Sequence, residues 1–400
     1  MIPDVWEVKT IVDIISKRNG IKIGPFGSQL KKELLVNSGY KVYGQENVFD
    51  KNFEIGNRYL TEQHFEKLKS CNLIFGDFII SMMGTIGKCM IVPENIEKGI
   101  MDSHLLRLRL NEKIIKPDLL LHFFSSNFLI NQVNKLSVGG IMDGLSSSIV
   151  KKIQFGLPNT LLEQTAIATA LSDADGLITG LEKLIAKKRK IKQGAMQQLL
   201  KPKEGWEVKK LGDICEIRKG KGISKSQICV DGKYKCILYG ELFTTYSDVI
   251  EIVISKTNFE GSIPSKEGDI LFPGSTTTTG IDLAKASTVL ENDVLLGGDI
   301  IIVRKQNYIY NSVFLTYFLN VIKRYEIAQN TKGITIHHLY GSDLASIKVE
   351  FPLIEEQIRI STILSDMDSE LSALEQKLEK YKKIKLGMMQ ELLTGKTRLN

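Results

Sequence analysis

A block of 38 residues occurs twice in this chain of 400 residues. Residues 163–200 align without gaps with residues 356–393, and 19 of the 38 aligned positions are identical. A longer segment precedes each copy, and the two longer segments match mainly where they begin, at Trp-Glu-Val-Lys from residue 6 and from residue 206. The order along the chain is therefore variable, shared, variable, shared, which favours two recognition modules on a common frame over one catalytic cleft.

The repeated block has the pattern of one long helix. Its apolar positions follow one another at alternating steps of three and four, and a stripe with a seven-residue repeat is the seam of a coiled coil. At about 1.5 Å per residue, the block makes a rod of roughly 60 Å. Because a folded segment separates the two copies, their simplest pairing is antiparallel. The expected interface consists of Leu171, Ile178, Leu181, Ile185, Leu364, Met367, Leu371, Leu374, Leu378 and Tyr381.

The two variable segments have the pattern of α/β modules. Short β-rich runs broken by glycine, such as residues 73–80, 105–110 and 300–303, precede helical patterns at 117–134 and 312–325. The predicted fold class is α+β, with two α/β modules joined by two long antiparallel coiled-coil helices in a pseudo-twofold arrangement. The predicted domains are a first module at 1–157, a central helix at 158–203, a second module at 204–351 and a C-terminal helix at 352–400.

Composition excludes several classes of protein. The chain is 43% hydrophobic and 25% charged, and it has no apolar run long enough to cross a bilayer. Its first residues lack a basic segment followed by a hydrophobic one, so we expect a cytoplasmic protein with no membrane partner. The five cysteines show no two-residue spacing, and the five histidines are scattered apart from His337 and His338. We therefore expect neither a metal nor a cofactor.

Charge points only weakly to a partner. The net charge of +7 slightly favours a polyanion. The basic stretch at residues 187–192 lies on the first predicted helix, where it is either a solvated face or a contact for a nucleic-acid backbone or an acidic partner.

No enzyme motif is recognisable in the sequence. The stretch at residues 84–88 lacks the upstream glycine of a phosphate-binding loop, because Met82 occupies that position. Neither the Asn-Pro-Pro-aromatic box of amino-methyl transfer nor a Gly-x-Ser-x-Gly elbow is present. We therefore expect no catalytic residues in this chain.

Three motifs resemble those of the DNA specificity subunit of type I restriction–modification enzymes. They are Gly-Trp-Glu-Val-Lys-Lys-Leu-Gly-Asp-Ile at 205–214, Phe-Pro-Leu-Ile-Glu-Glu-Gln at 351–357 and Met-Gln-Glu-Leu-Leu-Thr-Gly at 389–395. The resemblance spans essentially the whole chain, since both variable segments and both helical blocks follow the order of that family. The first copy departs from the pattern, because Pro158 stands one residue further from its Glu-Gln pair and no glycine precedes Trp6.

By this resemblance, each variable segment is a target recognition domain that reads one half of a bipartite, asymmetric sequence in double-stranded DNA. The paired helices hold the two domains apart and bind two methyltransferase subunits, and restriction subunits with translocase and nuclease activity join the complex. The chain itself is then a non-catalytic specificity subunit. A rod of roughly 60 Å is nearly two turns of B-DNA, each about 34 Å, so the helices can fix the distance between the half-sites.

We expect the DNA contacts to come from polar side chains near the start of each module and in its variable loops, at 82–88 and 273–280. Lysine and glutamine can bond the edges of guanine and adenine, whereas threonine reaches bases or phosphates. The candidates are Lys22, Ser28, Gln29, Lys31, Lys32, Gln45 and Lys88 in the first module, and Lys219, Lys221, Ser224, Lys225, Thr276, Thr277, Thr278, His337 and His338 in the second.

The sequence also allows two other interpretations. One is a coiled-coil adaptor whose two modules bind proteins rather than DNA. The other is an unrecognised enzyme, such as a methyltransferase that recognises its own target. The ordered motifs count against the adaptor, and the absence of methyl-donor motifs counts against the enzyme.

Overall fold

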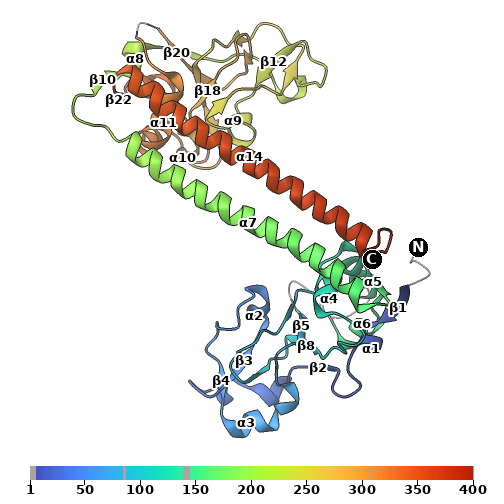
Figure 1. The fold of residues 1–400 in the computed structure, drawn as a ribbon. Helices are drawn as coiled ribbons and strands as arrows, with labels where there is room; N and C mark the ends of the chain where they lie inside the picture. The colour runs from blue at the N-terminus through green and yellow to red at the C-terminus, as the bar shows by residue number, and fades with distance from the viewer. Residues whose placement is uncertain (1–5, 84–86, 138–144, 307, 400) are drawn as a thin grey trace. The chain divides into compact units, whose positions relative to one another are not determined.

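The computed structural model describes residues 6–83, 87–137, 145–306 and 308–399. The chain divides into two compact units, the first made of Met1–Leu181 with Lys377–Asn400 and the second of Glu182–Gln376. The division passes through the two long helices, α7 (Leu161–Leu199) and α14 (Ile354–Leu392), which are drawn in Figure 1. Each unit therefore contains one globular module together with one end of each long helix.

The module of the first unit is built on two sheets and a strand pair. Strands β1 (Trp6–Thr10) and β9 (Gln154–Pro158) pair antiparallel, and β9 directly precedes α7. One sheet has the strand order β2-β8-β5-β6 and the other β4-β3-β7. Their strands are β2 (Ile21–Ile23), β3 (Tyr40–Tyr43), β4 (Tyr59–Leu60), β5 (Phe78–Ser81), β6 (Cys89–Ile91), β7 (Gly99–Met101) and β8 (Leu105–Leu108). The helices are α1 (Ile11–Ile14), α2 (Gln45–Phe49), α3 (Glu62–Lys67), α4 (Pro117–Phe124), α5 (Asn127–Ser137) and α6 (Ser147–Lys152), with 3-10 turns η1 (Gly27–Leu30), η2 (Lys32–Leu34) and η3 (Lys69–Cys71).

The module of the second unit has a larger set of strands. Its central sheet has the order β11-β20-β16-β18-β13, a second sheet has the order β14-β12-β19-β15, and two strand pairs are β10-β22 and β17-β21. The strands are β10 (Glu207–Lys210), β11 (Cys215–Lys219), β12 (Tyr234–Ile237), β13 (Val249–Ile250), β14 (Lys256–Thr257), β15 (Ile263–Pro264), β16 (Asp269–Pro273), β17 (Ser275–Thr276), β18 (Ser287–Val289), β19 (Leu295–Leu296), β20 (Ile300–Lys305), β21 (His337–His338) and β22 (Lys348–Phe351). The helices are α8 (Leu211–Ile214), α9 (Glu241–Thr244), α10 (Gly280–Leu283), α11 (Ser312–Val321), α12 (Arg324–Gln329) and α13 (Gly341–Ala345), with the 3-10 turn η4 (Lys225–Gln227).

The two modules share one layout. In each, the strand at the Trp-Glu-Val-Lys motif pairs antiparallel with the strand that precedes a long helix. The central strand order β2-β8-β5-β6 of the first module corresponds to β11-β20-β16-β18 of the second. An aspartate lies at the beginning of both equivalent strands, β5 and β16. Asp77 directly precedes β5, and Asp269 is the first residue of β16. The expected α+β class, with two α/β modules and two long helices, is confirmed.

Two elements differ from their sequence patterns. The β-rich run at 73–80 becomes a strand only from Phe78, because Gly76 has a φ of +81° and the backbone N–H of Ile74 donates to Asp77 Oδ2 at 2.9 Å, which makes a turn. The helical pattern at 117–134 forms two helices rather than one, because Ser126 Oγ accepts a hydrogen bond from the backbone N–H of Leu129 and starts α5 anew.

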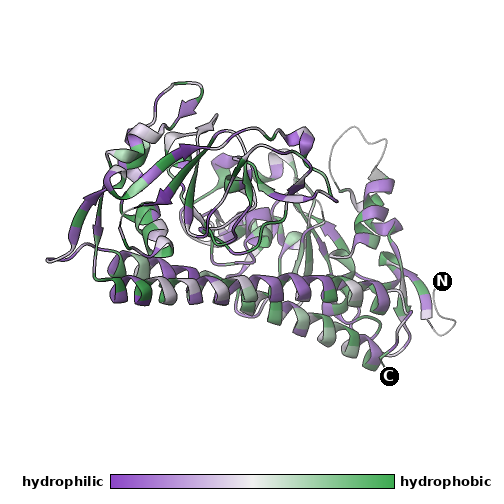
Figure 2. Cartoon of the chain, turned by 90° about the horizontal axis from the view of Figure 1, so that it is seen from above, coloured by the Kyte–Doolittle hydropathy of each residue, from purple (hydrophilic) through white to green (hydrophobic). Residues whose placement is uncertain are grey.

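The N-terminal turns of each long helix pack into a module core. In the first unit, Ile167 of α7 is fully buried in the same cluster as Phe78 of the central sheet. In the second unit, Ile360 of α14 is buried in the same cluster as Phe272. Figure 2 shows hydrophobic residues recurring among hydrophilic ones along both helices. Apolar burial therefore fixes one end of each helix to one module.

Candidate nucleic-acid interface and helix pair

The heptad stripe is the covered side of both long helices. Of the expected interface residues, five are buried and five are half-buried, whereas apolar residues outside the stripe, such as Leu177 and Ile384, are 54% and 43% exposed. The buried ones are Leu171, Ile185, Leu364, Leu371 and Leu378, and the half-buried ones are Ile178, Leu181, Met367, Leu374 and Tyr381.

In the second unit, basic side chains of α7 form ion pairs with acidic side chains of α14. Lys188 Nζ lies 2.7 Å from Glu370, Arg189 Nη2 lies 2.6 Å from Glu375, and Lys192 pairs with Asp368. Tyr317 Oη donates a hydrogen bond of 2.7 Å to Asp368 Oδ2, which ties this network to the module. Three of the five basic residues at 187–192 therefore have acidic partners within the same chain, whereas Lys187 and Lys190 are exposed.

The ion pairs also give the direction of the helices. In the second unit, Lys188 pairs with Glu370 and Lys203 with Glu356, so residue numbers rise on one helix as they fall on the other. In the first unit, Lys385 Nζ lies 2.5 Å from Asp175 Oδ1, and Arg398, beyond the end of α14, pairs with Glu163 near the start of α7. The helices are thus antiparallel within each unit, as expected.

A buried glutamine joins the start of each long helix to its module in the same way. Gln164 Nε2 donates to the carbonyl of Pro158 at 2.9 Å, and Gln357 Nε2 donates to the carbonyl of Pro352 at 2.8 Å. Each glutamine side-chain oxygen also accepts a hydrogen bond of 2.9 Å from a backbone N–H of its module. The donor to Gln164 is Lys116, and the donor to Gln357 is Asn311. The displaced proline of the first copy therefore leaves this contact intact.

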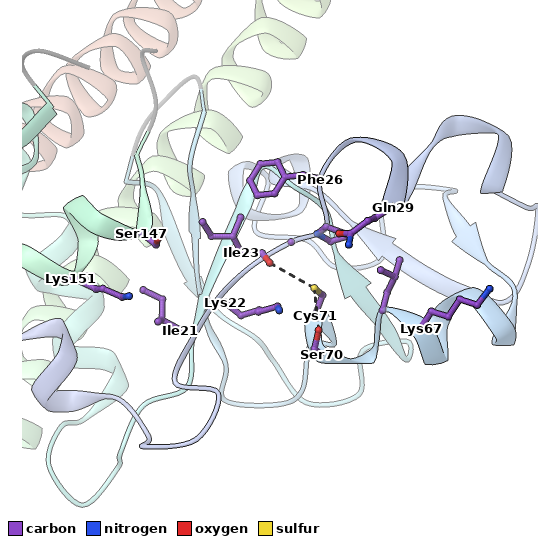
Figure 3. A pocket seen from close by; sticks show the side chains of 13 residues that line it. Ile21, Lys22, Ile23, Phe26, Gln29, Lys67, Ser70, Cys71, Ser147 and Lys151 are labelled. Atoms are coloured by element: carbon purple, nitrogen blue, oxygen red, sulfur yellow. Dashed lines mark hydrogen bonds between the residues drawn. The ribbon is translucent and has the colours of Figure 1, made fainter. Parts of the chain in front are cut away.

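Two of the candidates near the start of the first module, Lys22 and Gln29, line a pocket. Figure 3 shows Lys22 and Gln29 among the side chains that line it, together with Phe26, Lys67 and Lys151. Ser28, Lys31 and Lys32 are exposed on the neighbouring η1 and η2 segment. Lys67 and Lys151 were not among the candidates predicted from the sequence, because they lie on α3 and α6, far along the chain from β2, and only the tertiary fold brings them to it.

The two other candidates of the first module lie near each other, away from the residues that line this pocket. Lys88 Nζ sits 5.8 Å from the centre of the Phe49 ring, and Phe49 is one helical turn after Gln45 on α2. Gln45 Oε1 is buried and has no hydrogen-bond partner among the described residues. The middle of the expected loop, 84–86, lies outside the described residues.

A buried aspartate hydrogen-bonded to an arginine braces the central sheet of both modules. Arg109 Nε donates to Asp77 Oδ1 at 2.9 Å, and Arg304 Nε donates to Asp269 Oδ1 at 2.9 Å. Burial raises the pKa of the Asp77 carboxyl, and the hydrogen bond from Arg109 acts against that rise. The hydrogen bonds to Asp269 raise the pKa of Arg304. This pair belongs to the shared scaffold and not to a surface that could read DNA.

In the second module, the structure brings together candidates that are far apart in the sequence. Strands β17 and β21 pair antiparallel, which places Thr276 opposite His337 and Ser275 opposite His338. Thr276 Oγ1 and Thr278 Oγ1 lie 2.9 Å apart, so the threonine loop continues this ribbon. The expected residues Thr276, Thr277, Thr278, His337 and His338 therefore lie on one ribbon and its loop. Because successive strand residues point to opposite faces, His337 shares a face with Thr276, and His338 shares the other face with Ser275.

The remaining candidates of the second module border this ribbon or a separate pocket. Lys219 Nζ lies 3.2 Å from Asp299 Oδ1, and Asp299 also accepts a hydrogen bond from Ser275 of the ribbon. Lys221 lies two residues further along, and its backbone N–H donates to Leu296 O. Ser224 and Lys225 line a pocket with Tyr239, which sequence analysis missed.

Comparison with known proteins identifies the family. The family described as "Type I restriction modification DNA specificity domain" matches the sequence twice, over residues 3–193 and 203–385. These matches cover most of the chain, which therefore belongs to the family of type I restriction–modification DNA specificity subunits. The resemblance seen in the sequence motifs is confirmed, and family membership does not favour the adaptor interpretation.

Two specificity subunits of Methanocaldococcus jannaschii are similar in sequence. The putative type I restriction enzyme MjaX specificity subunit is 26% identical over 424 residues, covering 100% of this chain and 95% of that protein. The type I restriction enzyme MjaVIII specificity subunit is 27% identical over 333 residues, covering 76% of this chain and 75% of that protein.

Two solved structures share the fold. The type I restriction–modification S subunit from M. genitalium has a TM-score of 0.60 at 17% identity, covering 98% of this chain and 96% of its own. The second is a chain from a structure that concerns the complex assembly and conformational transition of the type I R-M system. It has a TM-score of 0.55 at 14% identity, covering 98% of both chains.

The part of the chain that the structure describes contains neither a candidate membrane span nor a candidate metal cluster. No helix in that part of the chain is both long and apolar enough to cross a bilayer. Among the same residues, no group of three or more histidine, cysteine, aspartate or glutamate side chains is placed to hold a metal ion.

Proposed function

We propose that this specificity subunit reads a bipartite sequence in double-stranded DNA, with one module on each half. The observation that carries the proposal is that the two modules share a scaffold but not a surface. Both have the same central strand order and the same buried aspartate–arginine pair, yet the first presents a lysine-lined pocket and the second a threonine and histidine ribbon. Different loops on one scaffold are expected where loops set specificity.

All sixteen candidate side chains are proposed DNA contacts, and the ribbon of the second module supports this best. Thr276 and His337 lie opposite each other on a two-stranded ribbon, an element that a major groove can admit. Their hydroxyl and imidazole groups can donate to or accept from base edges. In the first module, the exposed Gln29 has the side chain suited to an adenine edge, whereas the side-chain oxygen of Gln45 is buried.

The long helices are proposed to bind two methyltransferase subunits, with restriction subunits joining that complex. Leu177, Leu184 and Ile191 of α7 follow one another at seven-residue steps and are 54%, 38% and 47% exposed. Exposed apolar side chains in a row suit a protein partner. The chain itself is proposed to be non-catalytic, because a base must be flipped out of the stack for methylation, and the pocket for it belongs to the partner.

The proposed boundaries of the modules and helices are those expected from the sequence. The first module ends at residue 157, before α7, and the second begins at residue 204, after it. The second module ends at residue 351, the last residue of β22, and α14 begins shortly after. These boundaries define which segments can be exchanged between related subunits.

The test is an exchange of the first module. Residues 1–157 are replaced by the corresponding segment of another specificity subunit, and the chain is assembled with its methyltransferase subunits. Methylome sequencing should show a new sequence in one half of the methylated target and the original sequence in the other half. The matched control replaces 204–351 and should change the opposite half. An unchanged target, or one altered in both halves by a single exchange, contradicts one module per half-site.

A further inference from the structure

The pocket beside β2 is a basic cavity in the first module. Its volume is about 410 Å³, and its lining includes three lysines from three separate elements, β2, α3 and α6, and no aspartate or glutamate. The three are Lys22, Lys67 and Lys151. None of them forms an ion pair with a carboxylate in the part of the chain that the structure describes. Positive charge without internal compensation favours an anionic occupant.

A buried arginine adds to this charge from behind the β2 strand. Arg107 stands directly opposite Lys22 in the β2–β8 register, so both side chains lie on one face of the sheet. Arg107 is 0% exposed, and its Nε and Nη2 atoms have no hydrogen-bond partner among the described residues. Its Nη1 donates to the carbonyl of Asn72, next to Cys71 in the pocket wall. Like charges directly opposite each other destabilise a sheet, so the fold by itself gains nothing from this pair.

The second module shows that the scaffold does not need this arginine. Ile79 of β5 and Leu271 of β16 are equivalent, because each lies two positions after the aspartate of its strand, Asp77 or Asp269. Ile79 pairs with Arg107, and Leu271 pairs with Ile302. Ile302 is fully buried in an apolar cluster. The same register thus carries an apolar residue in one module and a buried arginine in the other. Arg107 Nε lies 3.9 Å from Asp77 Oδ2, a carboxylate that Arg109 already engages through a hydrogen bond of 2.9 Å. The buried arginine is therefore specific to the first module, and the shared scaffold does not require it.

We propose that this cavity holds a stretch of the DNA sugar–phosphate backbone, with the amines of Lys22, Lys67 and Lys151 each meeting a phosphate. Figure 3 shows the amines of Lys22, Lys67 and Lys151 well apart from one another rather than gathered at one point, which suits successive phosphates better than one small anion. Contacts to phosphate fix position and register and carry no sequence information. Lys22 then holds the backbone, and Gln29 and the exposed Phe26 at the rim are left to contact bases. This inference rests on the proposed function.

The test replaces all three lysines by glutamine in the complex with methyltransferase subunits. We expect the affinity for the target duplex and for a scrambled duplex to fall by a similar factor, about 10-fold or more at low salt. The slope of log affinity against log salt should fall by about 0.9 per lost phosphate contact, or about 2.7 in total. The methylated sequence should stay unchanged. A matched control replaces Lys17, Lys113 and Lys135, three exposed lysines outside the pocket, and should leave the slope nearly unchanged.

Three results overturn the proposal. One is a salt slope equal to that of the control. Another is an altered methylated sequence, which would mean that a lysine reads a base. The third is loss of inorganic phosphate binding by calorimetry while the DNA affinity persists, which would make the cavity a site for a free anion. If the triple variant does not fold, the test is repeated with the double variant K67Q/K151Q, in which both substitutions are at exposed positions. Failure of the unsubstituted complex to prefer its target over a scrambled duplex would instead overturn the proposed function.

Discussion

Arg398 donates hydrogen bonds to both carboxylate oxygens of Glu163, 235 residues away along the chain, at 2.9 and 2.8 Å. Glu163 is 4% exposed and also accepts a hydrogen bond from Trp6 Nε1 at 3.4 Å. The C-terminal tail, the start of α7 and the first strand thus meet at one carboxylate. In the second copy, the equivalent Glu356 pairs with Lys203, in the segment that leads from α7 to β10.

Replacing Arg398 by alanine should weaken the first unit. The substitution leaves the buried Glu163 carboxylate with fewer donors, and a buried acceptor that loses its partner is costly. We expect the midpoint of thermal unfolding to fall by about 2 to 4 °C. Lys396 is an exposed basic residue of the same tail, and Lys396→Ala is the matched control, expected to change the midpoint little. Equal shifts for the two variants would show that the Arg398 contact adds nothing.

The same contact predicts a pH dependence. Hydrogen bonds from Arg398 lower the pKa of Glu163 below its ordinary 4.5. Above pH 4.5 the carboxylate is ionised in the folded and unfolded chain, so the contribution of the contact is fully present. Below pH 4.5 the unfolded chain binds the proton first, and the contribution declines as the pH falls through the lowered folded pKa. The difference in midpoint between the wild type and R398A should therefore narrow in acid.

Sequence patterns predicted the helices better than the surfaces. The seven-residue repeat located α7 and α14 and the side that is covered, because that side follows from local periodicity. The Glu-Gln pairs were visible as a motif, but their contacts to Pro158 and Pro352 were not. The pocket beside β2 could only be found in part, since Lys67 and Lys151 reach it through tertiary structure. The ribbon pairing of Thr276 with His337 likewise joins segments that no local pattern connects.

Exchanging the charges of one interhelical pair should leave the stability intact. Lys188→Glu alone places two carboxylates together, because Lys188 faces Glu370 at 2.7 Å. Both side chains are more than a third exposed, so we expect the free energy of unfolding to fall by only about 1 kcal/mol. Adding Glu370→Lys should restore most of that loss in chemical unfolding. Lys187→Glu, one residue away, controls for the change in net charge. A double variant no more stable than K188E would contradict the pairing.

Removing the glutamine at the start of α14 should lower the free energy of unfolding more than removing any exposed ion pair. Gln357 is 1% exposed and joins the Pro352 carbonyl to the Asn311 N–H. Gln357→Ala leaves both backbone groups unpaired, so we expect about 1 to 3 kcal/mol of destabilisation in urea unfolding. Gln376→Ala, at an exposed position of the same helix, should change the stability by less than about 0.5 kcal/mol. Similar losses for the two variants would mean that water replaces the Gln357 contacts without cost.

Replacing Arg107 by isoleucine should separate stability from DNA binding. The second module carries Ile302 at this register, so the shared scaffold accommodates an isoleucine there, and Asp77 keeps its hydrogen bond from Arg109 when Arg107 is removed. We expect stability unchanged or up to about 2 kcal/mol higher, with weaker binding to target and scrambled duplexes alike. Arg109→Ala should instead lower stability by about 3 kcal/mol, because Asp77 loses its hydrogen-bonded partner. A large loss of stability in R107I would show that the scaffold requires this arginine.

Shortening both long helices by one heptad should change the unread spacer of the DNA target and nothing else. Deleting 178–184 together with 371–377 removes seven residues at equivalent places of the repeat and preserves the stripe on both helices. Each helix becomes shorter by about 10 Å, or roughly three base pairs at about 3.4 Å each. Methylome sequencing of the complex should show both half-sites intact with fewer bases between them. Deleting 178–184 alone is the control, because it leaves the helices unequal in length and should impair the pairing of α7 with α14. A spacer that stays the same length in the double deletion would mean that the helices do not set the distance between the half-sites.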